Sequence, residues 1–367
     1  MLKNKRSSII TLLIAVAALI ILSFMATLIK GNILKKEQIA IQIDTVSYGQ
    51  DGKADGQPLD EAPIKITGEY VYFQDRIVKR FYFDDHEMDE YSQVVYEILA
   101  DIPKNIEKTF MLVPSRIVYE DSLDIDDKSN FIKTFEEING HLGRVSQVLN
   151  VYEVLKEHTS EYIYFRTDET WTATGAYYAA KEYLAVNGVD IYPLDSYKEN
   201  RFIGYVGTMW AVEGGEYIFD SPDYVSYYTR EGMNNNQTIT ANENGDYIEY
   251  DSPALAVSRM GTDIFLGGIF SHSIIAGDEE NSKSLMIIGD KNAKLFAIWM
   301  IPYYEKICVL DPAYFDGEHE DLEYLVSSND ITELIVMTSM NTLDNQVRMD
   351  RIVNLMGFSE QNKTEEE

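Results

Sequence analysis

The chain has 367 residues, of which 45% are hydrophobic, so it is long enough to bury a sizeable core. Its formal net charge of −30 argues against binding to nucleic acid or to another anionic polymer, because bulk electrostatics would repel such a partner. The single cysteine, Cys308, excludes a disulfide or a cysteine-ligated metal site within one chain.

The first distinctive element is an uncharged apolar run from Ile9 to Ile29, with basic residues on both sides. It can cross a hydrocarbon core of about 30 Å, and it is longer than the apolar part of a cleavable signal, which has about 7 to 15 residues. We therefore predict that residues 1–30 form a short cytoplasmic stub and an uncleaved transmembrane signal anchor. Because basic residues are balanced across the run, charge alone does not fix its orientation.

The acidic charge lies entirely beyond this segment. Residues 1–37 contain six Lys or Arg and one Glu, a charge of +5, so the remainder carries −30 − 5 = −35. A polymer partner of that remainder would be neutral or cationic. The alternative is an acidic surface that only keeps the domain soluble.

Residues 31–67 contain closely spaced glycine and proline and are predicted to be a juxtamembrane linker. From Gly68 onward, strand and helix signals alternate, which predicts an α/β domain over residues 68–358. The expected strands are Tyr70–Phe73, Val78–Phe83 and Thr109–Val113, and the expected helices are Asp89–Ala100, Phe131–Leu142 and Val151–Lys156. This alternation favours a mainly parallel sheet with helices on both faces.

The stretch from Tyr162 to Asn187 contains the candidate site. We expect a buried strand at Tyr162–Phe165, a polar turn, and an amphipathic helix that begins near Thr174. The turn carries Asp168, Glu169, Thr170 and Trp171. Ligands of α/β proteins bind beyond the carboxyl ends of strands, so the sequence predicts a site at this turn.

This stretch resembles the signature of the DHHW proteins and of the related alginate O-acetyltransferase accessory proteins, which is close to Y-x-R-T-D-H-H-W-T-x-x-G-A-Y. The matching residues are Tyr164, Arg166, Thr167, Asp168, Trp171, Thr172, Gly175, Ala176 and Tyr177. Both histidine positions differ, because they hold Glu169 and Thr170. The resemblance implies an SGNH-hydrolase-like, flavodoxin-like fold in the bacterial cell envelope, with the amino terminus in the cytoplasm and the large domain outside.

The region after this motif has two parts. Residues 192–251 are rich in glycine and tyrosine and are predicted to be an inserted strand-and-loop region that ends in a hairpin. Further on, the expected strands are Ser284–Gly289, Lys306–Asp311 and Glu333–Thr338, and the expected helices are Ala293–Ile301, Leu322–Ser328 and Gln346–Met356. Residues 359–367 are expected to be an acidic tail. We expect the last three strands, Thr109–Val113 and Tyr162–Phe165 to share one sheet.

Two more positions depart from active relatives. The resemblance implies a nucleophilic serine directly after Asp290, where this chain has Lys291, and an oxyanion-binding asparagine after Gly267-Gly268, where it has Ile269. Isoleucine cannot donate a hydrogen bond to an oxyanion. The resemblance also implies that the Asp and the second His of the motif serve this serine, and Thr170 stands in that histidine position. The sequence therefore predicts a pseudoenzyme.

We predict no metal and no cofactor. The catalytic positions Asp168, Thr170, Ile269 and Lys291 are judged degenerate. The expected binding-cleft residues are Arg166, Asp168, Glu169, Trp171, His272, Asp290, Lys291 and Asn292. If the fold is correct, Lys291 faces Asp168 across the floor of the cleft, or else its ammonium group reaches water.

Three functions remain open from the sequence. The chain is a membrane-anchored pseudoenzyme that binds an envelope glycan or a partner protein, an O-acetyltransferase or esterase with an altered site, or a structural partner of a membrane-bound O-acyltransferase. A wild-type turnover of an aryl acetate would distinguish the enzyme from the other two. Glycan binding would separate the first from the third.

Overall fold

The computed structural model describes residues 63, 65–121, 123, 126–212, 223–243, 246–268, 270–315 and 319–343. The predicted anchor Ile9–Ile29, most of the linker, the predicted helix Gln346–Met356 and the site position Ile269 lie outside these ranges. Within the described ranges, no helix has both the length and the apolar character needed to span a bilayer.

The largest sheet formed by the described residues has the strand order β5-β4-β13-β11-β12-β10-β8-β9. Its parallel part consists of β5 (Gln147–Asn150), β4 (Glu107–Val113), β13 (Glu333–Ser339), β11 (Ser284–Gly289) and β12 (Lys306–Leu310). Its antiparallel part consists of β10 (His272–Ala276), β8 (Asn236–Glu243) and β9 (Asp246–Pro253). Every residue of β11 and β13 is buried, as expected for parallel strands that are covered on both faces.

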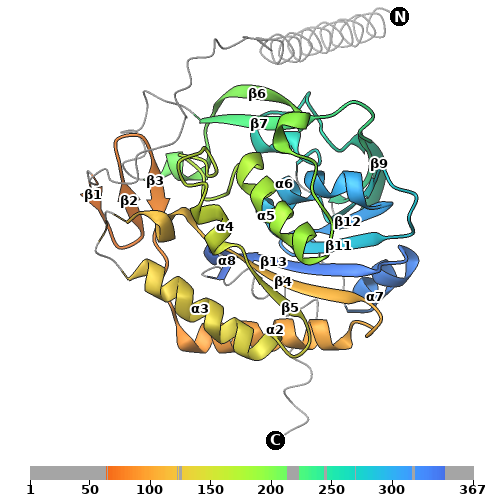
Figure 1. The fold of residues 1–367 in the computed structure, drawn as a ribbon, viewed down its shortest axis with the longest axis horizontal. Coiled ribbons are helices and arrows are strands. Elements are labelled where there is room, and N and C mark those ends of the chain that lie inside the picture. Colours follow the sequence, from red (N-terminus) through yellow and green to blue (C-terminus); the bar gives the residue numbers. More distant parts are fainter. Residues whose placement is uncertain are drawn as a thin grey trace, which may run out of the picture. The chain divides into compact units, whose positions relative to one another are not determined.

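Helices cover both faces of this sheet. Figure 1 shows α2 (Asp85–Asp101) and α3 (Asp127–Leu142) on one side, and α5 (Ala173–Val186) and α6 (Lys291–Met300) on the other. Shorter helices are α4 (Tyr152–Lys156), α7 (His319–Ser328) and α8 (Met340–Leu343); 3-10 turns are η1 (Arg116–Tyr119), η2 (Leu194–Ser196), η3 (Thr208–Ala211), η5 (Gly261–Ile264) and η6 (Ile301–Tyr303). The fold is therefore mixed α/β with one large sheet.

The prediction that Tyr162–Phe165 supplies a strand to the large sheet is wrong. The segment is buried, but its main chain pairs with its own returning turn: the Phe165 amide donates to Thr170 at 3.2 Å, and the Thr172 amide donates to Ile163 at 2.9 Å. A buried apolar run of four residues satisfies its backbone equally well in a sheet or in a tight loop, so its pattern could not distinguish the two. The other four expected strands do share one sheet.

The described residues also form two smaller sheets. In the first, β1 (Lys65–Ile66), β2 (Tyr70–Tyr72) and β3 (Ile77–Lys79) form an antiparallel meander. In the second, β6 (Lys198–Tyr205) pairs with β7 (Asp223–Thr229). Within the region predicted as an insertion, β6 and β7 thus form their own sheet, whereas the β8–β9 hairpin extends the large sheet through β10.

Candidate functional site

The motif loop ends where α5 begins, and one hydroxyl group fixes that start. Thr172 is the N-cap: its Oγ1 accepts a hydrogen bond from the Gly175 amide at 3.3 Å and donates to the Tyr162 carbonyl at 2.6 Å. A side chain at Gly175 would overlap the Ile163 carbonyl oxygen, so this close approach requires glycine. The helix start therefore holds the loop in its folded position.

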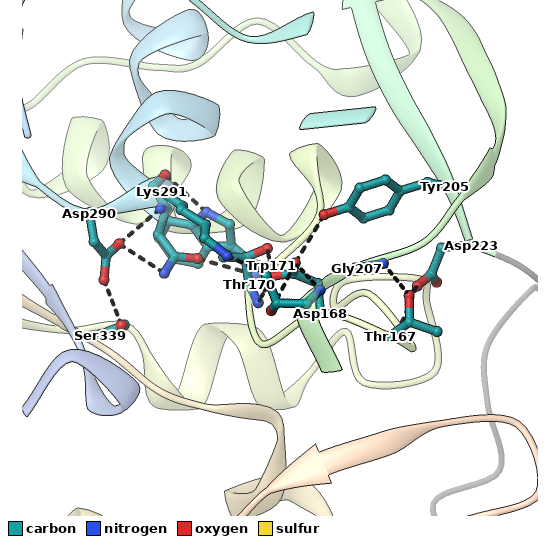
Figure 2. A network of polar contacts seen from close by, with 12 residues as sticks. Thr167, Asp168, Thr170, Trp171, Tyr205, Gly207, Asp223, Asp290, Lys291 and Ser339 are labelled. Carbon is teal, nitrogen blue, oxygen red and sulfur yellow. Dashed lines mark hydrogen bonds and ion pairs between the residues drawn. The ribbon is translucent and has the colours of Figure 1, made fainter. Parts of the chain in front are cut away.

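Asp168 is buried in this loop, and both of its carboxylate oxygens are occupied. Thr170 donates to Oδ1 from its amide at 3.2 Å and from its hydroxyl at 2.9 Å. Tyr205 donates to Oδ2 from its hydroxyl at 3.0 Å (Figure 2), and Thr208 donates to Oδ2 from its amide at 3.1 Å. Burial raises the pKa of Asp168, but the charge of Lys291 and these hydrogen bonds outweigh it, so the pKa lies below its ordinary value.

Lys291 lies opposite this carboxylate at the first position of α6, with one residue, Asp290, between it and the carboxyl end of β11. Its Nζ is 3.6 Å from Asp168 Oδ1, and its side chain is 33% exposed while that of Asp168 is 1% exposed. The expected pair is therefore present, within the range at which opposite charges interact strongly. About a third of the lysine side chain thus remains exposed to solvent.

Asp290 forms the other end of this polar network. It caps α6, and its Oδ1 accepts from the Asn292 amide at 2.8 Å and from the Asn292 side chain at 3.0 Å. Its Oδ2 accepts from the hydroxyls of Ser339 and Thr342, each at 2.6 Å. These four contacts fix the turn from β11 into α6, and they leave the buried Asp290 carboxylate as part of the framework.

Glu169 differs from Asp168. Burial raises its pKa, and the nearby charges of Lys291 and Lys79 only partly oppose that effect. A carboxyl group with a raised pKa holds its proton more firmly than usual, which is the property of a general acid or base.

Trp171 and Asn292, which the sequence placed in the binding cleft, are buried contacts between the motif and α6. The Trp171 amide donates to Asn292 Oδ1 at 3.2 Å, and its indole Nε1 donates to the Asn292 carbonyl at 3.1 Å. Trp171 is fully buried and Asn292 is 2% exposed. Their role is to lock the first turn of α6 against the motif, and thereby to position Lys291.

The contacts that Arg166 and His272 make are with residues other than Asp168 and Lys291. The Arg166 guanidinium lies 5.3 Å from the ring centre of Tyr162. His272 begins β10 and packs against Phe315, and burial lowers its pKa. Among the contacts of the described residues, none joins His272 to the pair, so the structure does not bring this candidate into the site.

Sequence reasoning missed the groups that come from distant segments. Tyr205 and Thr208 complete the shell around Asp168. Asp223, which is fully buried, accepts hydrogen bonds from the amides of Arg166 and Thr167 at 2.8 and 2.7 Å. The only sequence signal was Gly207, where a side chain would overlap Asp168, but a lone glycine in a loop indicates no partner.

Lys294 was also missed. Its ammonium donates to the Gly268 carbonyl at 2.7 Å and lies 3.8 Å from Asp311, and the residue is 8% exposed. The turn that it holds has three successive residues with positive φ: Leu266 at 55°, Gly267 at 79° and Gly268 at 107°. Of the three, only Leu266 is strained, because glycine adopts positive φ freely, and such a strained residue persists where surrounding contacts fix it.

Comparisons with known proteins support the family resemblance that the motif indicated. The model of the DHHW protein family matches residues 48–310, whereas no curated protein matches the sequence. A DHHW family protein from Eubacterium siraeum is 25% identical, with a TM-score of 0.65 over 80% of this chain and 97% of that chain. Bacillus cereus PatB1 with a sulfonyl adduct is 13% identical, with a TM-score of 0.61 over 78% and 99%. At that identity the likeness to PatB1 concerns the fold alone.

Proposed function

This chain belongs to the DHHW protein family, and on that premise we propose that it is a membrane-anchored, catalytically inactive, SGNH-hydrolase-like component of a bacterial system that O-acetylates an envelope polysaccharide. Its site binds a glycan or a partner protein and does not turn over an ester. The link to O-acetylation rests on the motif that it shares with alginate O-acetyltransferase accessory proteins, and the link to the membrane rests on the apolar run Ile9–Ile29.

The observation that carries the proposal is the ion pair between Lys291 and Asp168. The position that the family resemblance assigns to a nucleophilic hydroxyl holds an ammonium group 3.6 Å from the Asp168 carboxylate. A lysine that is charged and paired with a carboxylate is a poor nucleophile, because its lone pair is protonated. Loss of the nucleophile or the base alone removes most of the catalysis that a triad provides, about 10⁶-fold in kcat.

The base position supports the same conclusion. The Thr170 hydroxyl donates to Asp168 at 2.9 Å, so Asp168 orients a hydroxyl where relatives would have an imidazole. A threonine hydroxyl has no basic site near neutral pH and cannot accept the proton of a nucleophile. The geometry that would orient a catalytic base is therefore kept, while the base itself is absent.

One observation favours a second candidate, an esterase or O-acetyltransferase with an altered site. Glu169 has a pKa raised by burial, so it could exchange a proton near the reacting groups. This alternative requires a hydroxyl nucleophile near Glu169. The Thr170 hydroxyl, which is the nearest in sequence, is buried and already donates to Asp168.

The deciding experiment is hydrolysis of p-nitrophenyl acetate by the purified full chain in detergent. We expect the wild type and Asp168→Ala to release nitrophenol at the same rate as buffer. A wild-type rate that exceeds buffer and disappears in Glu169→Gln would establish the second candidate instead.

Membrane anchoring is tested separately. We expect the native chain to sediment with membranes, to resist extraction by high salt, and to retain its first residues in the mature protein. A mature amino terminus after residue 29 would show that the apolar run is a cleaved signal.

A further inference from the structure

The large sheet ends at β9, a long strand with one neighbour. β9 pairs with β8 through all eight of its residues, and among the described residues no strand pairs with its other edge. In an antiparallel edge strand, every second residue points its amide and its carbonyl away from the sheet. The outer edge of β9 is therefore a row of backbone donors and acceptors that matches another extended strand.

This edge lacks the backbone features that commonly protect the edges of sheets. Protected edge strands are short, or they contain a proline or a bulge. At the other end of the sheet, β5 has only four residues. β9 has eight, pairs with β8 in a continuous register, and has its one proline, Pro253, at the last position. Its geometry thus leaves room for a further strand.

Two exposed apolar side chains lie on one face of β9. Ile248 is 41% exposed and Tyr250 is 38% exposed, and they share a face because they are two residues apart in a strand. The partner of Tyr250 on β8 is Ile239, which is 1% exposed. Cross-strand partners lie on the same face, so the apolar layer that is buried at Ile239 continues onto β9, where it is exposed. An added strand with apolar residues on this face would extend that layer.

The opposite face of β9 is acidic. Glu249 and Asp251 alternate with the two apolar residues and therefore point to the other side of the sheet. Residues 236–253, which form β8, β9 and their turn, contain four acids and no lysine or arginine. The negative charge is thus local to this hairpin, and it would attract basic side chains on a strand that pairs with β9.

We propose that β9 is the docking edge for an extended segment of a partner protein, which joins the large sheet as a further strand and carries lysine or arginine at alternate residues. The backbone edge selects an extended strand, the apolar face selects apolar side chains, and the acidic face selects basic ones. This inference goes beyond the proposed function, because it concerns the edge of the sheet and does not depend on the chemistry at Asp168 and Lys291.

Other occupants match this edge less well. A second copy would bring the acids of one β9 close to those of the other, and like charges on paired strands are destabilising. An anionic membrane surface would be repelled by the same acids. A glycan has no regular row of amides and carbonyls to pair with the edge, whereas an extended peptide does.

The test uses the full chain in nanodiscs of zwitterionic lipid and three short peptides of equal length. The first alternates valine with lysine, and the second alternates valine with glutamate. The third is the lysine peptide with two adjacent prolines at its centre, which cannot donate to a strand ladder. Hydrogen exchange of residues 246–253 reports strand addition, because a paired peptide protects the outward amides. We expect the lysine peptide alone to protect this segment.

Charge variants locate the contact, with affinity measured by fluorescence anisotropy of the labelled lysine peptide. Glu249→Gln combined with Asp251→Asn should weaken binding about fivefold, because two exposed ion pairs are lost. The control, Glu90→Gln combined with Glu136→Gln, removes the same charge from exposed positions on α2 and α3 and should leave affinity unchanged. Glu249→Lys combined with Asp251→Lys should make the edge prefer the glutamate peptide.

Four results would overturn the inference. They are no protection by the lysine peptide, equal protection by the glutamate peptide, equal protection by the proline peptide, and equal weakening by the control variant. Protection that grows with the concentration of the chain alone would assign the edge to a second copy. Protection by anionic vesicles would assign it to lipid, and either outcome would equally reject a partner strand.

Discussion

Replacement of Lys291 by methionine tests whether the ion pair stabilises the domain. Methionine keeps most of the length and apolar surface of the lysine stem but removes the charge 3.6 Å from Asp168 Oδ1. Asp168 then remains ionised and buried without its cation, although Thr170, Tyr205 and Thr208 still donate hydrogen bonds to it. The variant therefore measures the charge interaction apart from the hydrogen-bond shell.

The expected magnitude follows from distance and exposure. At 3.6 Å, Coulomb's law gives about 5 kcal/mol at an effective dielectric constant of about 20 and about 1 kcal/mol in water. The lysine side chain is 33% exposed, so solvent screening moves the interaction energy toward the lower figure. The variant also avoids the cost of partly dehydrating the ammonium group on folding, which further reduces the net loss of stability. We expect Lys291→Met to lower the free energy of unfolding by about 1–2 kcal/mol, which corresponds to a fall in Tm of roughly 2–5 °C.

The assay is thermal unfolding of the purified full chain, followed by near-UV circular dichroism at pH 7. Lys291→Arg keeps the charge and should lose less stability than Lys291→Met. Lys181→Met removes an exposed lysine from α5 and should change Tm by less than the measurement error.

The pH dependence of the difference in Tm between the wild type and Lys291→Met tests whether the ion pair is the cause. Because the folded pKa of Asp168 is lowered, its stabilising contribution is present above the unfolded pKa of about 3.9 and is lost as pH falls through the folded pKa. Methionine at position 291 raises that folded pKa, so the variant loses the contribution at a higher pH than the wild type. The difference in Tm should be largest at pH 7 and should shrink below about pH 4. Equal Tm values at pH 7, or a difference that does not shrink in acid, would refute the reasoning.

Three further predictions follow from the site and the motif. Thr170→His combined with Lys291→Ser should produce a trace of aryl acetate hydrolysis while each single variant stays at the buffer rate, because nucleophile and base act as a unit; activity in a single variant would contradict this. Glu169→Gln should raise Tm at pH 7 and have little effect near pH 4, since a raised folded pKa means that stability falls as pH rises; a lower Tm at pH 7 would contradict it. Gly175→Ala should destabilise the domain by more than about 2 kcal/mol, because its methyl group overlaps a buried carbonyl oxygen. The control Gly140→Ala lies in α3 with open space around it and should stabilise the domain by up to about 1 kcal/mol. Urea unfolding measures both variants, and a tolerated Gly175→Ala would show that the motif loop can shift.

The parallel core was predictable from local pattern. The runs Leu285–Ile288 and Leu334–Met337 are apolar throughout, and only a strand covered on both faces buries every residue. The two helix starts were predicted to within two residues, near Thr174 and at Ala293. The structure shows that they are set by the capping residues Thr172 and Asp290, whose side chains accept hydrogen bonds from amides three and two positions later. These features depend on neighbours in sequence.

The same argument explains the failure at Tyr162–Phe165. Its backbone pairs with the returning turn, and the amides of the next two residues, Arg166 and Thr167, donate to Asp223, which is more than fifty residues away in the chain. An apolar run of four residues shows only that it is buried, and it does not show which donors and acceptors satisfy its amides and carbonyls.

The sequence by itself determined the family motif, the replacement of the expected base and nucleophile by Thr170 and Lys291, and a strand over Ser284–Gly289 followed by a helix. The predicted helix began at Ala293, and the structure shows that it begins two residues earlier, at Lys291. Only the tertiary structure decided how the vacated site is stabilised. Tyr205 and Thr208 reach Asp168 from β6 and the turn after it, and Trp171 locks α6 through Asn292. A buried carboxylate requires nearby donors and a compensating charge, but the sequence does not specify which segments supply them, because that depends on how distant segments pack.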